Sequence, residues 1–219
     1  MDRPLYICFE GLDGSGKSTL YGHVTKFLKD KGYKIHSLCP TRSVCSCKDK
    51  SKCSCQNIEG VFNRHPILNK SRFWRQFLYA YRSNTIAQNI NWNVDLVLGD
   101  RSLITSYVCR WTASNLYNKF VVFKVNLLEH IIPPPDHIFY LNTSHEEIQK
   151  RLDNRGARDI DETADRSMSM RRAYEEIRNN PKIIKRIANS KWHVIDGNQS
   201  EEKVFNDTLN ELLPLLPKK

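Results

Sequence analysis

The stretch Gly11–Thr19 reads Gly-Leu-Asp-Gly-Ser-Gly-Lys-Ser-Thr, which is the pattern of a phosphate-binding loop. The apolar run Leu5–Phe9 before it is typical of a buried strand, and residues 20–28 after it carry apolar side chains at helical spacing. The motif requires this order of strand, loop and helix. The glycines let backbone N–H groups surround a phosphate, and the helix start adds its positive dipole end. A glycine-rich turn without function is the alternative, and the flanking pattern disfavours it. The chain is therefore expected to bind a nucleotide.

The motif also predicts roles for individual loop residues. Lys17 would reach the outer phosphates, and the hydroxyl of Ser18 would hold a magnesium ion. The residues expected to bind the nucleotide are Gly11, Asp13, Gly14, Ser15, Gly16, Lys17, Ser18 and Thr19.

Length and composition set the limits. The 219 residues are most simply one domain, with 40% hydrophobic and 26% charged residues, as in a globular protein. No apolar run approaches the roughly 20 residues that a membrane helix needs, and the N-terminus leads straight into the first expected strand. We therefore expect a cytoplasmic or nuclear protein. The net charge of +10 favours an anionic partner without deciding between a nucleotide and a nucleic acid.

Expected strands and helices alternate along the chain. The expected strands are 5–9, 34–39, 94–99, 137–141 and 192–195, and the longer helices are 71–90, 144–154, 165 to about 188, and 201–213. Ser144 with Glu146 and Glu147 forms a capping-box start for one of these helices. The pattern predicts an α/β fold: a five-stranded parallel sheet covered by helices on both faces. Binding sites in such sheets lie at the carboxyl ends of the strands.

Asp100-Arg101 directly follows the third expected strand, at the end of the sheet that carries the phosphate loop. A carboxylate there can hold magnesium through water or accept a proton, and an arginine can bind a phosphate with its forked donors. A surface ion pair is the alternative interpretation.

Six segments follow one another in a set order: Phe9–Thr19, the arginine-bearing loop 40–43, Ala80-Tyr81-Arg82, Asp100-Arg101-Ser102, Pro135–Leu141, and the arginine-rich stretch 151–165 with residues 171–176. In this order they resemble the thymidylate kinase family of P-loop nucleoside monophosphate kinases. The resemblance spans nearly the whole chain, and the ordered set is much more specific than the phosphate loop alone.

The resemblance implies a reaction in which the terminal phosphoryl group of ATP moves, with Mg²⁺, to a deoxynucleoside monophosphate. dTMP is the expected acceptor and dUMP a further candidate. Asp13 matches a carboxylate that contacts the acceptor sugar, and Arg42 and Arg101 match residues that hold the acceptor phosphate. Arg82 matches an arginine that contacts the base. The resemblance also suggests a homodimer.

The resemblance further implies an arginine-rich lid, at about 155–165. One branch of the family carries a catalytic arginine in the loop at the position of Gly14, so here the lid is expected to supply that charge. Arg158 is the candidate, with Arg155 nearer the adenine, although either arginine could hold either role. A solvated basic loop is the alternative. The expected catalytic residues are Lys17, Asp100, Arg101 and Arg158.

Ser102 departs from the family, which has a tyrosine there; Asp-Arg-Ser is similar to the Glu-Arg-Ser motif of deoxynucleoside kinases. Those enzymes need a carboxylate base after the second strand to activate a neutral hydroxyl. This chain has Thr41-Arg42 there, which suits an acceptor already bearing a phosphate. A deoxynucleoside (thymidine) kinase remains the alternative, followed by a non-catalytic nucleotide- or nucleic-acid-binding protein.

The base pocket is less defined by the sequence. Phe77 is the candidate for stacking on the base, with a plain core position as the alternative, and Tyr107 and Trp111 are expected to shape the pocket.

A cysteine-rich insertion, at about 43–60, holds Cys45, Cys47, Cys53 and Cys55. Four thiolates can form a tetrahedral zinc site, although Cys-x-Cys spacing is tight for two ligands to one ion. Inert thiols on a solvated loop, disulfides or a redox switch are the alternatives.

Overall fold

The computed structural model describes residues 3–40, 72–155 and 164–217. These residues form a parallel five-stranded sheet in the order β2-β3-β1-β4-β5. The strands are β1 Leu5–Gly11, β2 Ile35–Leu38, β3 Leu96–Asp100, β4 His137–Asn142 and β5 Lys191–Asp196. The helices are α1 Lys17–Asp30, α4 Arg72–Gln88, α5 Leu103–Val108, α6 Asn115–Leu128, α7 His145–Arg155, α8 Ala164–Asn179 and α9 Glu201–Leu212, with 3₁₀ turns η2 Pro181–Ile183, η3 Lys185–Ile187 and η4 Leu213–Leu215. The predicted fold class is confirmed.

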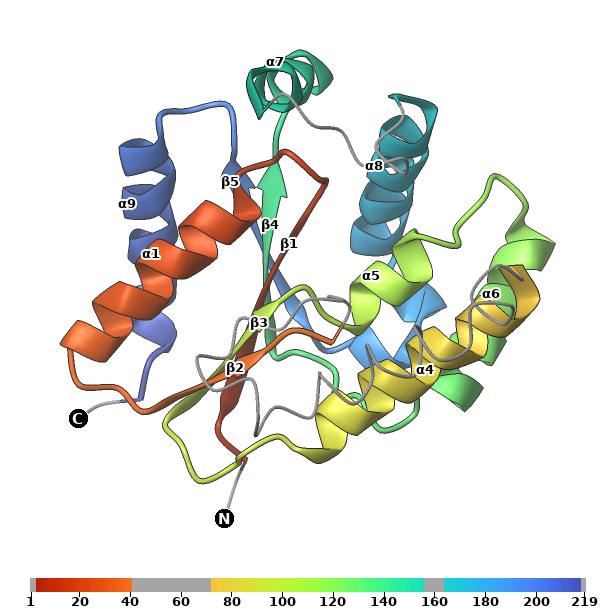
Figure 1. Ribbon diagram of the computed structural model, residues 1–219, viewed down its shortest axis with the longest axis horizontal. Coiled ribbons are helices and arrows are strands. Elements are labelled where there is room, and N and C mark those ends of the chain that lie inside the picture. Colours follow the sequence, from red (N-terminus) through yellow and green to blue (C-terminus); the bar gives the residue numbers. More distant parts are fainter. Residues whose placement is uncertain (1–2, 41–71, 156–163, 218–219) are drawn as a thin grey trace.

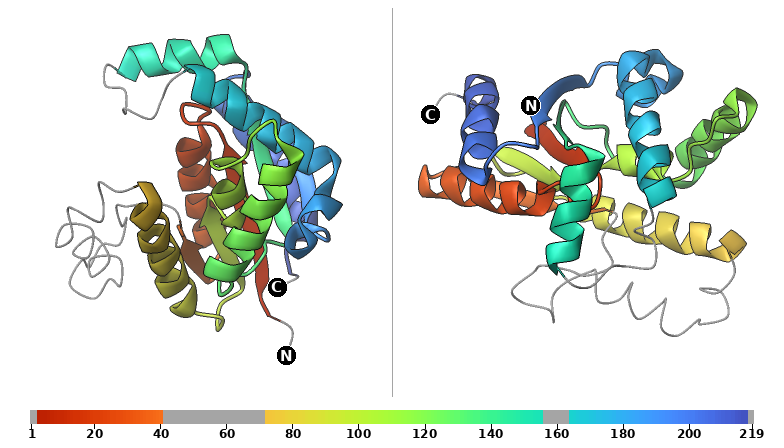
Figure 2. Two further views of the ribbon diagram at one scale, coloured as in Figure 1. Left: turned by 90° about the vertical axis from the view of Figure 1, so that its right-hand side faces the viewer. Right: turned by 90° about the horizontal axis from the view of Figure 1, so that it is seen from above.

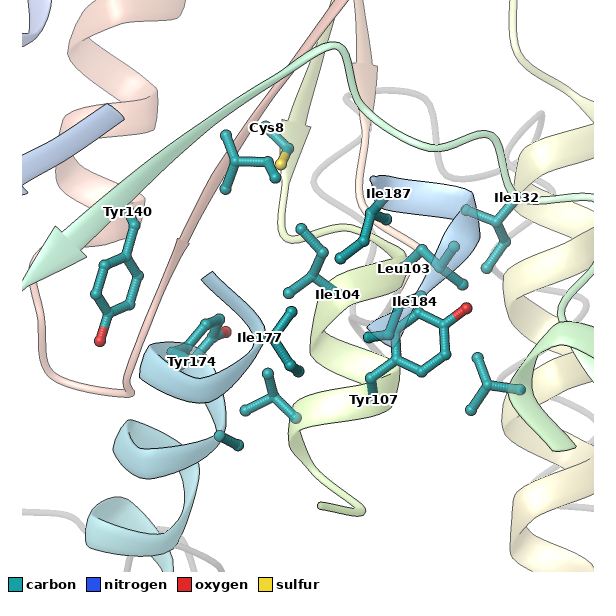
Figure 3. Packing of buried hydrophobic residues seen from close by; sticks show 14 of the residues in the cluster. Cys8, Leu103, Ile104, Tyr107, Ile132, Tyr140, Tyr174, Ile177, Ile184 and Ile187 are labelled. Carbon is teal, nitrogen blue, oxygen red and sulfur yellow. The ribbon is translucent and has the colours of Figure 1, made fainter. Parts of the chain in front are cut away.

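Alternate residues of the central strand enter two cores, one on each face of the sheet. Ile7 and Phe9 of β1 pack on the face covered by α1 and α9, where the rings of Phe27 and Phe205 lie 6.0 Å apart. Tyr6 and Cys8 pack on the other face, under α4, α5, α6 and α8. Figures 1 and 2 show the two helical layers, and Figure 3 shows part of the second core. Burial on both faces explains why the strands read as continuous apolar runs.

The sheet order determines where a site can form. β1 lies between β3 and β4, with Phe9 in register with Asp100 of β3 and with Phe139 of β4. The loop that follows β1 therefore emerges between the ends of β3 and β4, and α7 lies above these ends (Figure 1). Within the described ranges, no helix is long and apolar enough to cross a membrane.

Helix ends agree with the sequence in one case and differ in another. Ser144 caps α7 by accepting a hydrogen bond from the backbone N–H of Glu147, at 3.2 Å, so the predicted helix start is confirmed. The reciprocal bond of a capping box is replaced, because the N–H of Ser144 donates to the side chain of Asn198. The helix expected to run to about residue 188 instead ends at Asn179. Asn180, which precedes Pro181, has φ −136° and ψ 69°, outside the helical region. The correction has a physical reason, because proline disfavours a helical residue before it.

Candidate active site

The phosphate loop has the backbone that its sequence requires. Gly14 and Gly16 have φ of 83° and 91°, in the left-handed region that favours glycine. A side chain on Gly11 would come within 2.9 Å of the Ser15 hydroxyl and 3.0 Å of the Leu141 carbonyl oxygen. The loop is thus folded against the end of β4 and leads directly into α1, so its N–H groups lie at a helix N-terminus, where anions bind.

Lys17, the first residue of α1, turns its side chain back into this loop. Its ammonium group donates to the Leu12 carbonyl oxygen at 3.2 Å and lies 3.8 Å from a carboxylate oxygen of Asp13. The residue is only 5% exposed. Burial, followed by the charge of Arg101, lowers the pKa of Lys17 to about 8.

Arg101 emerges from the end of β3 in an unusual conformation. Its φ is 72°, and no other described non-glycine residue has a positive φ. Such a conformation costs roughly 1–2 kcal/mol. The backbone N–H of Arg101 donates to the Phe9 carbonyl oxygen at 3.0 Å, which ties the turn to β1. Its guanidinium then reaches the phosphate loop, where it donates to the Gly11 carbonyl oxygen at 3.3 Å and to the carboxylate of Asp13.

The three side chains form one ionic group, in which Asp13 lies between Lys17 and Arg101. Burial by itself would raise the pKa of Asp13, but the charges of Arg101 and Lys17 outweigh this effect and hold it below its usual value. The Asp13 carboxylate is therefore ionised. The buried Lys17 and the partly buried Arg101, on either side of an exposed carboxylate, are suited to binding phosphate groups from two directions.

The sequence analysis includes Arg151 only as the first residue of the arginine-rich stretch 151–165, whereas in the structure its side chain contacts the phosphate loop. Arg151 of α7 donates to the Ser15 carbonyl oxygen at 3.1 Å and to the Gly197 carbonyl oxygen at 2.9 Å, and it pairs with Glu147 at 2.8 Å. Arginine bonded to two carbonyls from separate segments fixes the loop relative to the chain after β5. Besides its place in that stretch, the sequence shows that it lies four residues after Glu147, which is typical of a helical ion pair.

The predicted acceptor residues of α4 lie on two different faces of the helix. The buried Arg82 stacks on the ring of Tyr79, 5.0 Å from its centroid. Phe77 is 41% exposed, and its ring lies 5.7 Å from that of Trp74. Ser83 donates to the Pro40 carbonyl oxygen at 3.0 Å, so the middle of α4 is fixed at the end of β2. Phe77 is thus accessible to a base, and its stacking role stays a prediction.

Tyr107 and Trp111, which were expected to shape the base pocket, lie in the core. Tyr107 is fully buried in the core (Figure 3). Its hydroxyl donates to Asn126 of α6 at 2.6 Å. Trp111 donates its ring N–H to Glu176 of α8 at 2.8 Å. Direct contact of Tyr107 with an acceptor would require its neighbours to move, so this role also stays a prediction.

Several predicted residues lie outside the described residues or their described side chains. They are Arg42, Arg158, the cysteines Cys45, Cys47, Cys53 and Cys55, and the side chain of Arg155 at the end of α7. Across 3–40, 72–155 and 164–217, no group of three or more His, Cys, Asp or Glu side chains could hold a metal. The zinc site therefore stays a prediction about the insertion.

The residues present suit magnesium bound together with phosphates. Ser18 is exposed on the first turn of α1, and the buried carboxylate of Asp100 ends the strand beside β1. Asp100 lies near enough for its charge to raise the pKa of Lys17 against the larger lowering effect of burial. Hydroxyl and carboxylate oxygens are the ligands that Mg²⁺ prefers, with phosphate oxygens and water completing its shell.

A phosphate loop at the end of the central strand of this five-stranded parallel sheet defines a P-loop kinase fold. A solved structure described as deoxyadenosine kinase from M. mycoides with bound dATP shares the fold, with a TM-score of 0.62 and 18% identity over 95% of this chain and 100% of that chain. The family model described as Thymidylate kinase matches residues 9–208.

Curated proteins named thymidylate kinase are similar along the whole length. The protein from Mycoplasma mobile is 26% identical over 98% of this chain and 100% of its own length. The protein from Leptospira interrogans is 28% identical over 96% and 95%, respectively. The chain belongs to the thymidylate kinase family and is a phosphotransferase.

Proposed function

We propose that this enzyme transfers the terminal phosphoryl group of ATP to the phosphate of dTMP, giving ADP and dTDP, with dUMP as a further candidate acceptor. The observation that carries the proposal is the contact of Asp13 with both Lys17 and Arg101. It brings the lysine of the donor loop and the arginine of the acceptor side to the same carboxylate. The names of the curated relatives support thymidylate as the acceptor.

The proposed step needs no general base. An oxygen of the acceptor phosphate is already ionised; it attacks the terminal phosphorus of ATP, and the bond from that phosphorus to the bridging oxygen breaks with its electron pair leaving on ADP. Because the two substrates are anions that repel each other, their positioning and the neutralisation of their charge would provide most of the rate enhancement. Lys17 would bind the transferred phosphoryl group. Arg101 would give up its ion pair with Asp13 and bind the acceptor phosphate instead. The carboxylate of Asp13 would then be available to contact the acceptor sugar.

Magnesium fits the same proposal. Ser18 and Asp100 would hold the ion, directly or through water, and the ion when bound would neutralise phosphate charge during the transfer.

The remaining site residues are assigned by family resemblance. Arg42 would hold the acceptor phosphate with Arg101, and Arg82 and Phe77 would contact the base. Arg158 would neutralise the transferred group, with Arg155 nearer the adenine. An arginine in this position is worth roughly 10³–10⁵ in rate in related phosphoryl transfers.

A panel of acceptors with ATP and Mg²⁺ tests the proposal. Thymidine, dTMP, dUMP and the other deoxynucleoside monophosphates are compared by chromatography of the products, with Lys17→Ala as the inactive control. Conversion of dTMP to dTDP at a rate well above that of thymidine phosphorylation is expected. Phosphorylation of thymidine without conversion of any monophosphate would show a deoxynucleoside kinase instead.

We also propose that the enzyme is a homodimer formed through α6. An apolar stripe on this helix is exposed, at the side of the molecule away from α1 and α9 (Figure 1). Its residues are Leu116, Tyr117, Phe120, Phe123 and Leu127. Contiguous exposed apolar surface of this kind is typical of an interface between proteins, and its helical spacing suits the same helix of a second copy.

A further inference from the structure

Glu10 lies fully buried near the carboxyl end of β1, where four hydrogen-bond donors converge on its carboxylate. One carboxylate oxygen accepts from the backbone N–H of Ser102 at 2.8 Å and from its hydroxyl at 2.7 Å. The other accepts from the hydroxyls of Thr105 and Tyr174, each at 2.8 Å. A buried carboxylate is strongly unfavourable unless such donors satisfy it. These contacts leave the loop-proximal end of β1 tied to both α5 and α8.

The Ser102 contacts matter because Ser102 follows Arg101, the described non-glycine residue with positive φ. The N–H of Arg101 donates to the Phe9 carbonyl oxygen, and the next N–H, of Ser102, donates to the Glu10 side chain. Two successive peptide groups of the turn are thus held by two successive residues of β1. A left-handed arginine persists only where its surroundings over-determine the backbone, and this arrangement does so.

The turn decides where the guanidinium of Arg101 points. In the left-handed conformation it reaches the Gly11 carbonyl oxygen and the carboxylate of Asp13 in the phosphate loop. Without the contact from Glu10 to Ser102, only the bond from the Arg101 N–H to Phe9 would hold the backbone of the turn against its strain. Relaxation of Arg101 towards the right-handed region would then be favoured, and it would turn the guanidinium away from the loop.

Tyr174 connects the same carboxylate to α8. Its ring lies 4.9 Å from that of Tyr140 in β4, and Figure 3 shows Tyr174 in the core next to Ile177. Burial raises the pKa of Tyr174 well above its usual value, so the phenol stays protonated and its hydroxyl donates a hydrogen bond to Glu10.

We propose that Glu10 is a positioning residue, which holds Arg101 in the conformation that binds the acceptor phosphate and couples that conformation to α8 through Tyr174. The inference rests on the proposed role of Arg101 as the acceptor-phosphate ligand. Glu10 is fully buried, so it would act on acceptor affinity through Arg101 and not by its own contact with a nucleotide.

The test compares steady-state KM values for dTMP and ATP in two Glu10 variants. Glu10→Leu removes every acceptor and is expected to raise KM for dTMP about tenfold while KM for ATP stays within about twofold. Glu10→Gln keeps a carbonyl oxygen for the Ser102 N–H and is expected to stay within about threefold of the parent in both values. A purely structural role of Glu10 would not separate the two substrates.

A double-mutant cycle with Arg101→Ala makes the test specific. In the Arg101→Ala background, Glu10→Leu is expected to change KM for dTMP by less than about twofold, because the side chain that Glu10 positions is gone. Should Glu10→Leu fail to fold, as judged by circular dichroism, Ser102→Ala replaces it. Its expected effect is about threefold on KM for dTMP, again only when Arg101 is present.

Two results would overturn the inference alone: an unchanged KM for dTMP in the folded Glu10→Leu or Ser102→Ala variant, or effects that add fully to that of Arg101→Ala. In both cases Arg101→Ala by itself would still raise KM for dTMP, and the proposed function would stand. An Arg101→Ala enzyme with unchanged KM for dTMP would instead overturn the proposed role of Arg101, and with it the inference.

Discussion

Arg101, at the end of β3, donates to the carboxylate of Asp13 in the phosphate loop, 88 residues earlier in the chain. The parallel pairing of β1 with β3 brings the two residues together, because Asp100, which directly precedes Arg101, lies in register with Phe9, four residues before Asp13. This contact joins the part of the site that the loop motif predicts to the part that follows the third strand.

Replacing Arg101 with alanine is expected to lower kcat/KM for dTMP roughly 10- to 100-fold, with a small effect on KM for ATP. The reason is the loss of charge-assisted hydrogen bonds, each worth about 1.5–3 kcal/mol. Steady-state kinetics with each substrate varied in turn measures the effect. Arg3→Ala is the matched control, because Arg3 pairs with Asp136 at the opposite end of the sheet; equal losses in the two variants would contradict the assignment.

Lys17 is expected to take up a proton when ATP binds near pH 8. With a pKa of about 8 it is half deprotonated at that pH, and bound phosphates favour its charged form, so about half a proton is taken up. Affinity for ATP should fall as pH rises through 8, since charging the amine then costs free energy. Titration calorimetry at pH 8 in buffers of different ionisation enthalpy measures the uptake, which should shrink at pH 6.5.

The control for this experiment is Lys17→Arg, whose guanidinium stays charged throughout the range. An uptake of the same size in that variant would assign the proton to another group.

Gly11→Ala is expected to weaken ATP binding. Gly11 has φ of 150°, and an added Cβ would meet Ser15 and the backbone of Leu141 at 2.9–3.0 Å, so the loop must shift. Gly22→Ala is the contrasting control: nothing lies within 4 Å of its Cβ position in the helix α1, and it should stabilise the protein by about 0.5–1 kcal/mol. For both variants, urea unfolding measures the stability and nucleotide titration measures the affinity for ATP. Normal ATP affinity in Gly11→Ala would refute the close packing around Gly11.

Phe123→Lys on α6 is expected to convert the proposed dimer into a monomer, because Phe123 is 64% exposed within the apolar stripe and a buried ammonium group is unfavourable at an interface. Light scattering coupled to size-exclusion chromatography measures the mass. Leu213→Lys, at an exposed apolar position after α9, serves as the control. A monomeric parent protein would rule out the dimer.

Stability is expected to fall below pH 6.5 through His137. Burial, then the charges of His193 and Lys191, lower the pKa of His137, and its ring lies within hydrogen-bond distance of His193, at 2.9 Å. His137 therefore binds a proton more readily in the unfolded chain than in the folded protein. The stability that neutral His137 contributes is complete above the unfolded pKa of about 6.5 and is lost as pH falls below it. Urea midpoints at pH 8 and pH 5.5 measure the loss, and His137→Gln should show a smaller difference than the parent.

Several features could be predicted from the sequence because they depend on neighbouring residues. The loop spacing between Gly11 and Thr19 and the Ser144 cap are local patterns, and the structure shows both as expected. The end of α8 was misjudged because apolar residues after Pro181 continue the helical spacing, although proline stops the helix there. The role of Tyr107 is harder to predict, because every residue of its helix is buried and spacing does not reveal which side faces the site; its contact with the base stays a prediction.

The sequence by itself determined that a nucleotide-binding loop begins this chain, that strands and helices alternate after it, and that the ordered motifs belong to one kinase family. These properties depend on residue type and spacing over a few turns of chain. Only the tertiary structure decided that Asp13 pairs with Arg101, that Arg151 holds the loop, and that Glu10 anchors the turn beside Arg101. Each of these contacts joins segments far apart in the chain, and the sheet order and register that bring them within hydrogen-bond distance are fixed by packing of the whole molecule.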